Sequence, residues 1–464
     1  MFNISDLYKN VFGSQAKFLN SEDVIITSVE HDTRRIKKGA LYVAIKGENL
    51  DGHSFVTDAE QKGAVACLVD HKIEGLKIAQ IIVPDTVYAY GELAKFWRRK
   101  IKYPIIGLTG SNGKTTTKDI LFTILSYKNK VFRTQGNFNN LIGAPYTVLS
   151  FPLDGDFGIV EMGMNATGEI SRIAEIAAPN VGLITNIGRA HIGKLGSIEA
   201  ILYAKMELFD YMLKEKSSFF VVNLSDKKIS KWVSDKGIKN KMTFCSPSSE
   251  DVSSLKEADI RIEQVSEASD QQVFKIILKS GEIKTGKIKL SGVHNLSNVA
   301  AGVATACHLG IKLDDCIKAL ETFIPPAMRS NMIVKDGVKY LIDCYNANPD
   351  SMIAAIETGE EVSDVKRHIA IVGDMLELDS FSSALHEEIG VFLGRKKYDY
   401  VFAIGLYADD YRKGFLKTSS ADRISIYDAK NIDVLKKDIR SFIKKGDFVL
   451  IKASRGMRLE TILD

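Results

Sequence analysis

Apolar residues in the middle of this sequence gather in short continuous runs, and segments with a helical period lie between the runs. The runs are "YPIIGLTG", "KVFRTQG", "FGIVEMGM" and "VGLITNIG", and the helical segment "KTTTKDILFTILSYK" follows the first of them. Continuous apolar runs that are bounded by glycine and separated by helices are typical of a parallel sheet covered on both faces. We therefore predict an α/β unit in the middle of the chain.

The pattern changes on either side of this unit. The first hundred residues carry the shorter strand-like runs "DVIITSV", "ALYVAI", "AVACLVD" and "AQIIVP", and they close with the amphipathic helix "VYAYGELAKFWRRK" before Tyr103-Pro104. After Ile324-Pro325-Pro326, the buried runs "VKYLIDCYN", "RHIAIVGDM", "YDYVFAIG" and "DFVLIKAS" alternate with helical segments. This alternation predicts a second doubly wound sheet.

Residues from about 240 to 290 interrupt the central pattern, because polar and apolar residues alternate there, as in "IRIEQVSEASDQQVFKIILKSGEIKTGKIKL". Alternation of this kind predicts an antiparallel excursion of hairpins. The small-residue helix "HNLSNVAAGVATACHLG" ends the central part. We predict an α/β protein with an N-terminal domain over 1–100, a central phosphate-loop domain over 101–322 and a C-terminal Rossmann-like domain over 323–464.

Composition narrows the class of protein. At 464 residues and 45% hydrophobic content the chain can bury several cores, and a net charge of +4 argues against a protein that coats nucleic acid. The five cysteines include no C-x-x-C pair, which favours reduced thiols. The start lacks a signal-peptide pattern, and no stretch reaches the roughly 18 apolar residues of a membrane span. We expect a soluble cytoplasmic protein with no nucleic-acid partner.

The segment "IIGLTGSNGKTTTKDIL", residues 105–121, has the parts of a phosphate-binding loop but departs from G-x-x-x-x-G-K-[ST], because Leu108 stands at the first glycine. Gly110 and Gly113 let backbone N–H groups point inward, Lys114 suits the β- and γ-phosphates, and a hydroxyl for Mg²⁺ follows. The alternative is a glycine-rich turn without a ligand. The Lys-Thr pair between a strand and a helix favours a nucleoside triphosphate site.

Three further residues follow neighbouring strands. Glu161 closes the strand in "GIVEMGMNATGEI", where ligands of open α/β sheets lie, and a carboxylate there suits Mg²⁺. His191 lies just past the next strand, and Lys205 lies in the following helix. Alone, His191 would be read as a surface loop histidine and Lys205 as a solvated lysine. Around a phosphate loop they indicate a metal-dependent ATP site with more than one cation.

The segments "TGSNGKTTTKD", "EMGMNATGEI", "NIGRAHIGKLGSIEAILYAKMELF" and "GVHNLSNVAAGVA" resemble the Mur ligases, the ATP-dependent amide-forming enzymes of peptidoglycan synthesis. The loop pattern of that family, T-G-[ST]-N-G-K-T-T, tolerates Leu108. "TQGNFNNLIGAPYTVL", "IDCYNANPDSMIAAI", "VGDMLEL" and "VLIKASRGMRLE" resemble the member that joins UDP-MurNAc-tripeptide to D-Ala-D-Ala. The resemblance runs from about Asp32 to Glu460 and implies the three-domain architecture of the family.

The resemblance also implies roles for single residues. The loop residues implied to bind the ATP phosphates are Thr109, Gly110, Ser111, Asn112, Gly113, Lys114, Thr115 and Thr116. The other implied nucleotide contacts are Asn295 and Asn298 at adenine, Asp343 and Tyr345 at ribose and adenine, and Arg329 at the phosphates.

The implied metal site holds two Mg²⁺ ions. Thr115 and Glu161 would bind one ion, and His191 would bind the second, with Glu161 near both. Lys205 matches the lysine that CO₂ carbamylates in this family, and a carbamate offers the anionic oxygen that a hard divalent ion prefers. The implied cofactors are therefore ATP, two Mg²⁺ ions and CO₂ as a lysine carbamate.

The implied substrate contacts are spread over all three domains: Asp32, Thr33 and Arg34 for UDP, Thr134, Asn139 and Asn140 for the sugar-peptide, and Lys452, Ser454 and Arg455 for the D-alanyl-D-alanine end. Two residues depart from the family pattern near that end: Ala453 stands where the family has glycine, and Asp379 stands where it often has glycine.

The implied reaction proceeds through an acyl phosphate, and the sequence names no base for the attacking amine. It also leaves the third residue of the tripeptide open between diaminopimelate and lysine. We expect a monomer. The alternatives are the ligase that adds the third residue, a folate-polyglutamate ligase, and a phosphate-loop switch without ligase activity. "NFNNLIGAP", "CYNANPDSM" and "GDMLEL" weigh against the first two, and the set Lys114, Glu161, His191 and Lys205 weighs against the third.

Overall fold

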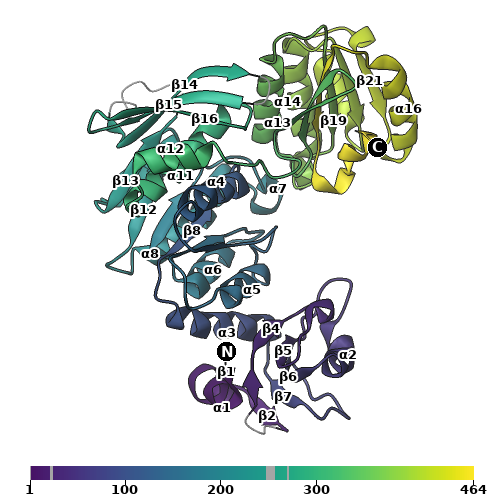
Figure 1. The fold of residues 1–464 in the computed structure, drawn as a ribbon. Coiled ribbons are helices and arrows are strands. Elements are labelled where there is room, and N and C mark those ends of the chain that lie inside the picture. Colours follow the sequence, from purple (N-terminus) through teal and green to yellow (C-terminus); the bar gives the residue numbers. More distant parts are fainter. Residues whose placement is uncertain (1, 21–23, 247–256, 269–270, 464) are drawn as a thin grey trace.

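The computed structural model describes residues 2–20, 24–246, 257–268 and 271–463. Over these residues, α/β units follow one another along the chain, and the central unit lies between the first and the last (Figure 1). The continuous apolar runs form buried strands with parallel neighbours, so the predicted α/β class is confirmed.

The first unit is a small sheet in the order β2-β7-β6-β5-β4, in which β2 is antiparallel to β7 and the other neighbours are parallel. Its strands are β2 (Lys17–Leu19), β4 (Ser28–Glu30), β5 (Ala40–Val43), β6 (Ala64–Val69) and β7 (Ala79–Ile82). Helix α2 (Val56–Gln61) covers one face. At the start of the chain, strand β1 (Phe2–Asn3) pairs with β3 (Ile25–Ile26), and helix α1 (Ile4–Leu7) follows β1 in the sequence.

Helix α3 (Thr86–Lys100) leads from this sheet into the central unit and packs against two of its helices, α5 (Gly143–Ser150) and α6 (Glu169–Ala177). Asp85 caps the first turn of α3. Near the other end, the buried guanidinium of Arg98 donates hydrogen bonds to the carbonyls of Ala177 and Ala178. Because those carbonyls end α6, the last turn of α3 is bound to the central unit.

The central unit is one sheet in the order β16-β15-β14-β13-β12-β11-β8-β10-β9. Its parallel strands are β8 (Ile105–Thr109), β9 (Val131–Arg133), β10 (Phe157–Glu161), β11 (Val181–Ile184), β12 (Phe219–Asn223) and β13 (Lys241–Cys245). Strand β15 (Gln271–Leu278) is antiparallel to both β14 (Ile260–Ala268) and β16 (Ile283–Ile288), which confirms the predicted excursion there. At its start, near residue 240, the prediction was wrong, because β13 is parallel to β12 and to β14. Residues 247–256 and 269–270 of that prediction lie outside the described residues.

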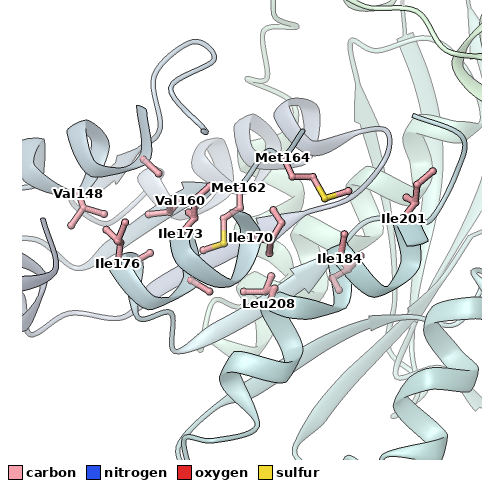
Figure 2. Close-up of a cluster of buried hydrophobic side chains, with 14 of the residues drawn as sticks. Val148, Val160, Met162, Met164, Ile170, Ile173, Ile176, Ile184, Ile201 and Leu208 are labelled. Carbon is pink, nitrogen blue, oxygen red and sulfur yellow. The ribbon is translucent and has the colours of Figure 1, made fainter. Parts of the chain in front are cut away.

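Helices cover both faces of the central sheet. One face carries α4 (Lys114–Ser126), α11 (His294–His308) and α12 (Leu313–Leu320). The other carries α5 (Gly143–Ser150), α6 (Glu169–Ala177), α8 (Ile198–Met212) and α9 (Lys227–Asp235). Figure 2 shows part of the second layer, where Ile170, Ile173 and Ile176 of α6 and Leu208 of α8 meet Val160 and Ile184 of the strands. This packing holds the carboxyl ends of β8, β10 and β11 side by side.

The last unit is a sheet in the order β17-β18-β22-β19-β20-β21, parallel apart from the pairing of β17 with β18. Its strands are β17 (Asn331–Lys335), β18 (Val338–Asp343), β19 (His368–Gly373), β20 (Tyr400–Ile404), β21 (Ile424–Tyr427) and β22 (Phe448–Lys452). Its helices are α13 (Pro349–Glu360), α14 (Ser382–Arg395) and α15 (Ala408–Phe415) on one face and α16 (Ile432–Phe442) on the other. The predicted second doubly wound sheet is confirmed. Among the described helices, none is long and apolar enough to span a membrane.

Candidate active site

The glycine-rich segment joins β8 to α4, as predicted, and two glycines are required by its geometry. Gly113 adopts a left-handed backbone (φ 79°) at the start of α4, and a Cβ added there would lie 2.2 Å from Asn298 Oδ1. At Gly110 (φ 149°) an added Cβ would lie 1.9 Å from Thr185 Oγ1. The loop therefore packs closely against Thr185 at Gly110 and against Asn298 at Gly113. Backbone N–H groups at the start of such a helix suit a bound anion.

Two lysines meet at this loop. Lys114 Nζ donates to the carbonyl of Gly110 at 2.7 Å, and Lys205 Nζ, from α8, donates to the same carbonyl at 3.1 Å. Burial and the nearby Lys114 hold the pKa of Lys205 well below its usual value. Burial also lowers the pKa of Lys114, opposed by the charges of Glu161 and Glu377. The loop is thus lined by two lysine amines, and burial favours the uncharged form of each.

Glu161, at the end of β10, is almost fully buried beside the first turn of α4. Its Oε1 accepts hydrogen bonds from Thr115 Oγ1 at 3.2 Å and Asn139 Nδ2 at 2.8 Å, and its backbone N–H donates to Thr134 Oγ1. Its Oε2 lies 3.5 Å from Lys118 Nζ and has no hydrogen-bond partner among the described residues. An orphaned carboxylate oxygen beside a threonine hydroxyl suits a hard cation.

His191 lies on the other side of β8, because the sheet order is β11-β8-β10 and His191 follows β11. Its backbone is left-handed (φ 63°), and its Nδ1 lies 3.1 Å from Glu377 Oε2 of the last unit. Burial and the charges of Lys114 and Lys205 lower its pKa to about 3. His191 is therefore a neutral imidazole at physiological pH, the form that binds metals.

Glu377 was not predicted as a site residue. It lies between β19 and the short helix at Asp379–Phe381, in the segment "GDMLEL", and reaches the site only through packing between units. The signal in the sequence was a carboxylate just beyond the carboxyl end of a buried strand. The same criterion, a carboxylate near the carboxyl end of a buried strand, had identified Glu161.

In the part of the chain that the structure describes, Glu161 and His191 do not belong to a group of three or more His, Cys, Asp or Glu side chains close enough to bind one metal ion together. Among the described residues such a cluster occurs at His53, Asp70 and His71, in the first unit. There the ring of His53 is already engaged, since Nδ1 lies 2.6 Å from Asp51 Oδ1 and Nε2 accepts the backbone N–H of Asp70. The cluster is explained by these hydrogen bonds.

A cavity of about 190 Å³ opens between the start of α4 and the last unit. Its walls include Thr115, Lys118, Arg133, Arg329 and Tyr345. The guanidinium of Arg329 lies 3.8 Å from the centre of the Tyr345 ring. The structure thus brings Arg329 and Tyr345, two residues of the predicted nucleotide set, to the phosphate loop. Together they offer a cation and a flat aromatic surface.

Other predicted nucleotide contacts have protein partners. Asn298 and Asn295 are buried and bonded to each other, and Asn298 Oδ1 accepts from Thr117 Oγ1 of α4. Asp343 Oδ2 pairs with Lys452 Nζ at 2.8 Å, which joins a residue assigned to ribose with one assigned to the dipeptide end. In the loop, Thr109 and Ser111 donate to backbone carbonyls, Thr116 is buried, and the backbone N–H of Asn112 donates to Asn186.

The predicted substrate residues lie in separate places. Asp32 accepts three side-chain hydrogen-bond contacts from Arg34, which lowers the pKa of Asp32 to about 2, and the Arg34 side chain is largely exposed. Asn140 Oδ1 accepts two backbone N–H groups at the start of α5. Ser454 is buried with Oγ accepting the N–H of Leu376. Two further placements complete the set: Thr33 lies in the turn beside Asp32, and Arg455 pairs with Glu460.

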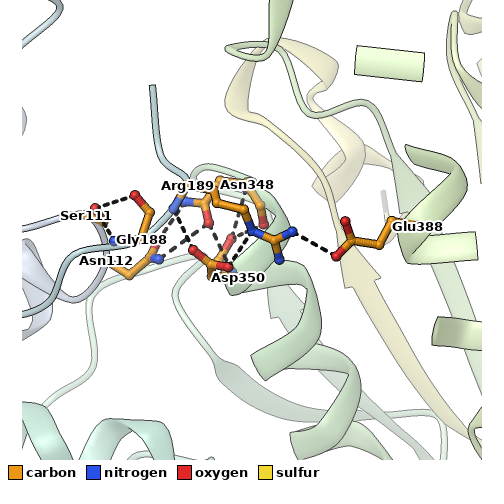
Figure 3. A network of polar contacts seen from close by, with 8 residues as sticks. Ser111, Asn112, Gly188, Arg189, Asn348, Asp350 and Glu388 are labelled. Carbon is orange, nitrogen blue, oxygen red and sulfur yellow. Dashed lines mark hydrogen bonds and ion pairs between the residues drawn. The ribbon is translucent and has the colours of Figure 1, made fainter. Parts of the chain in front are cut away.

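A polar network joins the phosphate loop to the last unit (Figure 3). The side-chain amides of Asn112 and Asn348 bond to each other, with Asn348 Nδ2 donating to Asn112 Oδ1 at 2.7 Å. Asn348 also caps α13. Arg189 extends from the loop after β11 to Asp350 and Glu388. The first turn of α13 is thereby held against the nucleotide loop.

Comparisons with known proteins follow the same order of units. The family described as Mur ligase family, catalytic domain, matches residues 25–98, the Mur ligase middle domain matches 108–306, and the Mur ligase, glutamate ligase domain, matches 328–455. The UDP-N-acetylmuramoyl-tripeptide–D-alanyl-D-alanine ligase of Bacillus subtilis (strain 168) is 34% identical over 464 residues, covering 99% of this chain and 96% of that protein.

Solved structures agree along the whole chain. A crystal structure of MurF from Acinetobacter baumannii superposes with a TM-score of 0.88 at 28% identity, covering 100% of this chain and 98% of that one. The MurF ligase from Thermotoga maritima in complex with ADP gives a TM-score of 0.82 at 28% identity, over 95% and 97% of the two chains. The chain therefore belongs to the Mur ligase family, among relatives named UDP-N-acetylmuramoyl-tripeptide–D-alanyl-D-alanine ligases.

Proposed function

We propose that this protein is an ATP-dependent ligase of peptidoglycan synthesis that joins UDP-MurNAc-tripeptide to D-Ala-D-Ala through an acyl phosphate. The observation that carries the proposal is the phosphate loop with Lys114 and Lys205 on one carbonyl, in a chain that matches named ligases of this kind from end to end. The relatives at 30–34% identity carry the name of this ligase, which favours it over the two neighbouring ligases considered above.

The residues present fit two divalent cations. Glu161 Oε2 and His191 Nδ1 are buried and lack a hydrogen-bond partner among the described residues, and the two residues follow β10 and β11, the strands on either side of β8. We assign Thr115 and Glu161 to one Mg²⁺ and His191 to a second. Bound Mg²⁺ would offset the negative charge of the ATP phosphates.

We also propose that Lys205 is carbamylated and contributes to the second ion. Support comes from its burial, which holds the pKa of Lys205 well below its usual value. An amine must be unprotonated to add CO₂, and the resulting carbamate offers the oxygen ligands that Mg²⁺ prefers. Few lysines meet that condition at neutral pH, because the exposed side chain is protonated.

The reaction would run in two steps. The terminal carboxylate of the tripeptide would attack the γ-phosphate of ATP and release ADP, which leaves an acyl phosphate. The amine of D-Ala-D-Ala, once deprotonated, would then attack the acyl carbon, release phosphate and lose a further proton as the amide forms. Both steps bring anions together, so Lys114 and Arg329 would reduce the repulsion. A water-excluding junction between the central and last units would protect the acyl phosphate from hydrolysis.

The remaining roles are proposals of the same kind. We assign the loop residues 109–116, Asn295, Asn298, Asp343 and Tyr345 to ATP, Asp32, Thr33 and Arg34 to UDP, Thr134, Asn139 and Asn140 to the sugar-peptide, and Lys452, Ser454 and Arg455 to D-Ala-D-Ala. We further propose domains at 1–100, 101–322 and 323–464 and a monomer that works in the cytoplasm, where ATP is available.

One assay tests the function. Phosphate release from ATP is measured with UDP-MurNAc-tripeptide, with and without D-Ala-D-Ala, and the ligated product is identified by mass. We expect release to depend on both peptide substrates. Release that is independent of the dipeptide would reject the ligase assignment, and release with UDP-MurNAc-dipeptide and a free amino acid as the two substrates would favour the ligase that adds the third residue.

A further inference from the structure

The carboxylate of Glu377 stands at the edge of the nucleotide site, although it belongs to the last unit. Its Oε2 lies 3.1 Å from Nδ1 of His191, and about a third of its side chain is exposed. Glu161, a carboxylate on the other side of β8, is almost fully buried. Glu377 therefore offers a negative charge that a soluble molecule can reach.

The backbone around Glu377 is held on both sides. The N–H of Met375 donates to Nε2 of His386 at 2.9 Å, and the N–H of Leu376 donates to Oγ of Ser454 at 3.0 Å. A Cβ added to Gly193 would lie 2.6 Å from the carbonyl carbon of Leu378, so the segment also packs closely on the loop that carries His191. The position of the carboxylate is thus set by packing before any substrate arrives.

The charge of Glu377 acts on the groups that face the phosphates. It opposes the lowering of the pKa of both Lys114 and Lys205, so it lies within electrostatic reach of both lysine side chains. Glu161 acts on Lys114 in the same way but is engaged by Thr115 and Asn139. Glu377 has His191 as its neighbour and remains open to a further cation.

The second substrate arrives as a cation. A free α-amino group has a pKa of about 7.7–8.0, so much of it is protonated near neutral pH. Its nitrogen must come within about 3–3.5 Å of the acyl carbon, which is bonded to the phosphate that Lys114 holds. A carboxylate beside Lys114 and on the open side of the site is placed to receive that ammonium group.

We propose that Glu377 binds the α-ammonium group of the incoming D-alanyl-D-alanine and positions its nitrogen at the reacting carbonyl. The inference rests on the proposed ligase function and names the residue that recognises its amine substrate. The carboxylate accepts hydrogen bonds from the ammonium group, and the rest of the dipeptide extends toward the last unit, where Ser454 supports the segment that carries Glu377.

The test uses the variant Glu377→Gln in the full-length enzyme. We expect the KM for D-Ala-D-Ala to rise at least about tenfold, the loss of one charge-assisted contact, while the KM values for ATP and UDP-MurNAc-tripeptide stay within about twofold. Glu377→Asp keeps the charge and should show a smaller rise. Glu388→Gln, on the outer side of the same junction, is the matched control and should leave the KM for the dipeptide unchanged.

A second measurement separates amine recognition from a structural role. Propionyl-D-alanine has the shape of the dipeptide without its amino group, and its inhibition constant is compared with the KM for the dipeptide. The wild-type enzyme should prefer the amine-bearing molecule, and Glu377→Gln should lose that preference. An unchanged preference, or a change confined to the Mg²⁺ requirement, would overturn the proposal. Wild-type enzyme without dipeptide-dependent phosphate release would instead reject the ligase function.

Discussion

Asp350 accepts two hydrogen bonds from Arg189 across the junction of the central and last units, one from the backbone N–H at 2.6 Å and one from Nε at 2.8 Å. Because Asp350 lies in the first turn of α13, two residues after the Asn348 that bonds to the phosphate loop, the pair fixes α13 relative to that loop. Figure 3 shows how the two contacts lie side by side.

Replacement of Asp350 should therefore weaken the junction between the central and last units. We expect Asp350→Ala to lower kcat/KM for ATP about tenfold, since the change removes two hydrogen bonds to a charged group. Steady-state kinetics with saturating peptide substrates measures the effect. Glu388→Ala removes the more exposed partner of Arg189 and should change the same ratio by no more than about twofold. Equal effects of the two variants would contradict the assigned role of Asp350.

Lys205 is the residue whose replacement tests the carbamate. We expect Lys205→Ala to lower turnover at least about a hundredfold, because the variant lacks a ligand of the second ion. Acetate or propionate should restore part of the activity by supplying a carboxylate in the space left by the side chain. Lys194→Ala, which removes an exposed lysine near His191, is the control and should retain activity. Wild-type turnover in Lys205→Ala would rule out the carbamate.

His191 makes the stability of the metal-free protein sensitive to acid. Its pKa falls from the ordinary 6.5 to about 3 in the folded protein, so between these values the unfolded chain binds the extra proton. Stability contributed by the neutral ring is present above pH 6.5 and declines as the pH falls below it. Between pH 7 and 5.5 the loss is roughly 1 kcal/mol. Denaturant unfolding in a chelator should show this loss reduced in His191→Gln, and identical pH slopes would refute it.

Ile173 lies at the centre of the layer between α6 and the central sheet and is fully buried (Figure 2). We expect Ile173→Ala to lower the free energy of unfolding of the central unit by about 2–4 kcal/mol, because the side chain leaves a cavity. Guanidinium unfolding followed by tryptophan fluorescence measures the change. Leu153→Ala, at a half-exposed position, should cost no more than about 0.5 kcal/mol.

The elements that sequence reasoning predicted well are those set by local pattern. The runs that became β8, β10 and β11 are apolar throughout because both faces of the strands are covered, and the same burial makes them recognisable in sequence. The phosphate loop was recognisable because glycine and lysine spacing records a backbone geometry directly. Glu161 was found because it ends such a strand.

Contacts between distant segments could not be predicted in this way. Glu377 reaches His191 only because two units pack together, and Asp343 pairs with Lys452 because β18 and β22 are neighbours in one sheet; no spacing along the chain records either arrangement. The asparagines show a second limit. Asn140, Asn295 and Asn298 stand in family motifs, yet in this structure their side chains bond to the protein itself. The same amide group serves a turn or a ligand, so residue type alone does not decide between the two.

Helix α3 bears on how the first sheet can move. The helix begins beside that sheet at its Asp85 cap, but Arg98 at its far end is bonded into the central unit. A rod anchored at its far end cannot act as a hinge there. Phe2 and Arg35 of the first unit also contact Trp97 of α3 and Tyr146 of α5, so any movement of the first sheet would have to break these contacts as well as bend the chain at residues 83–85.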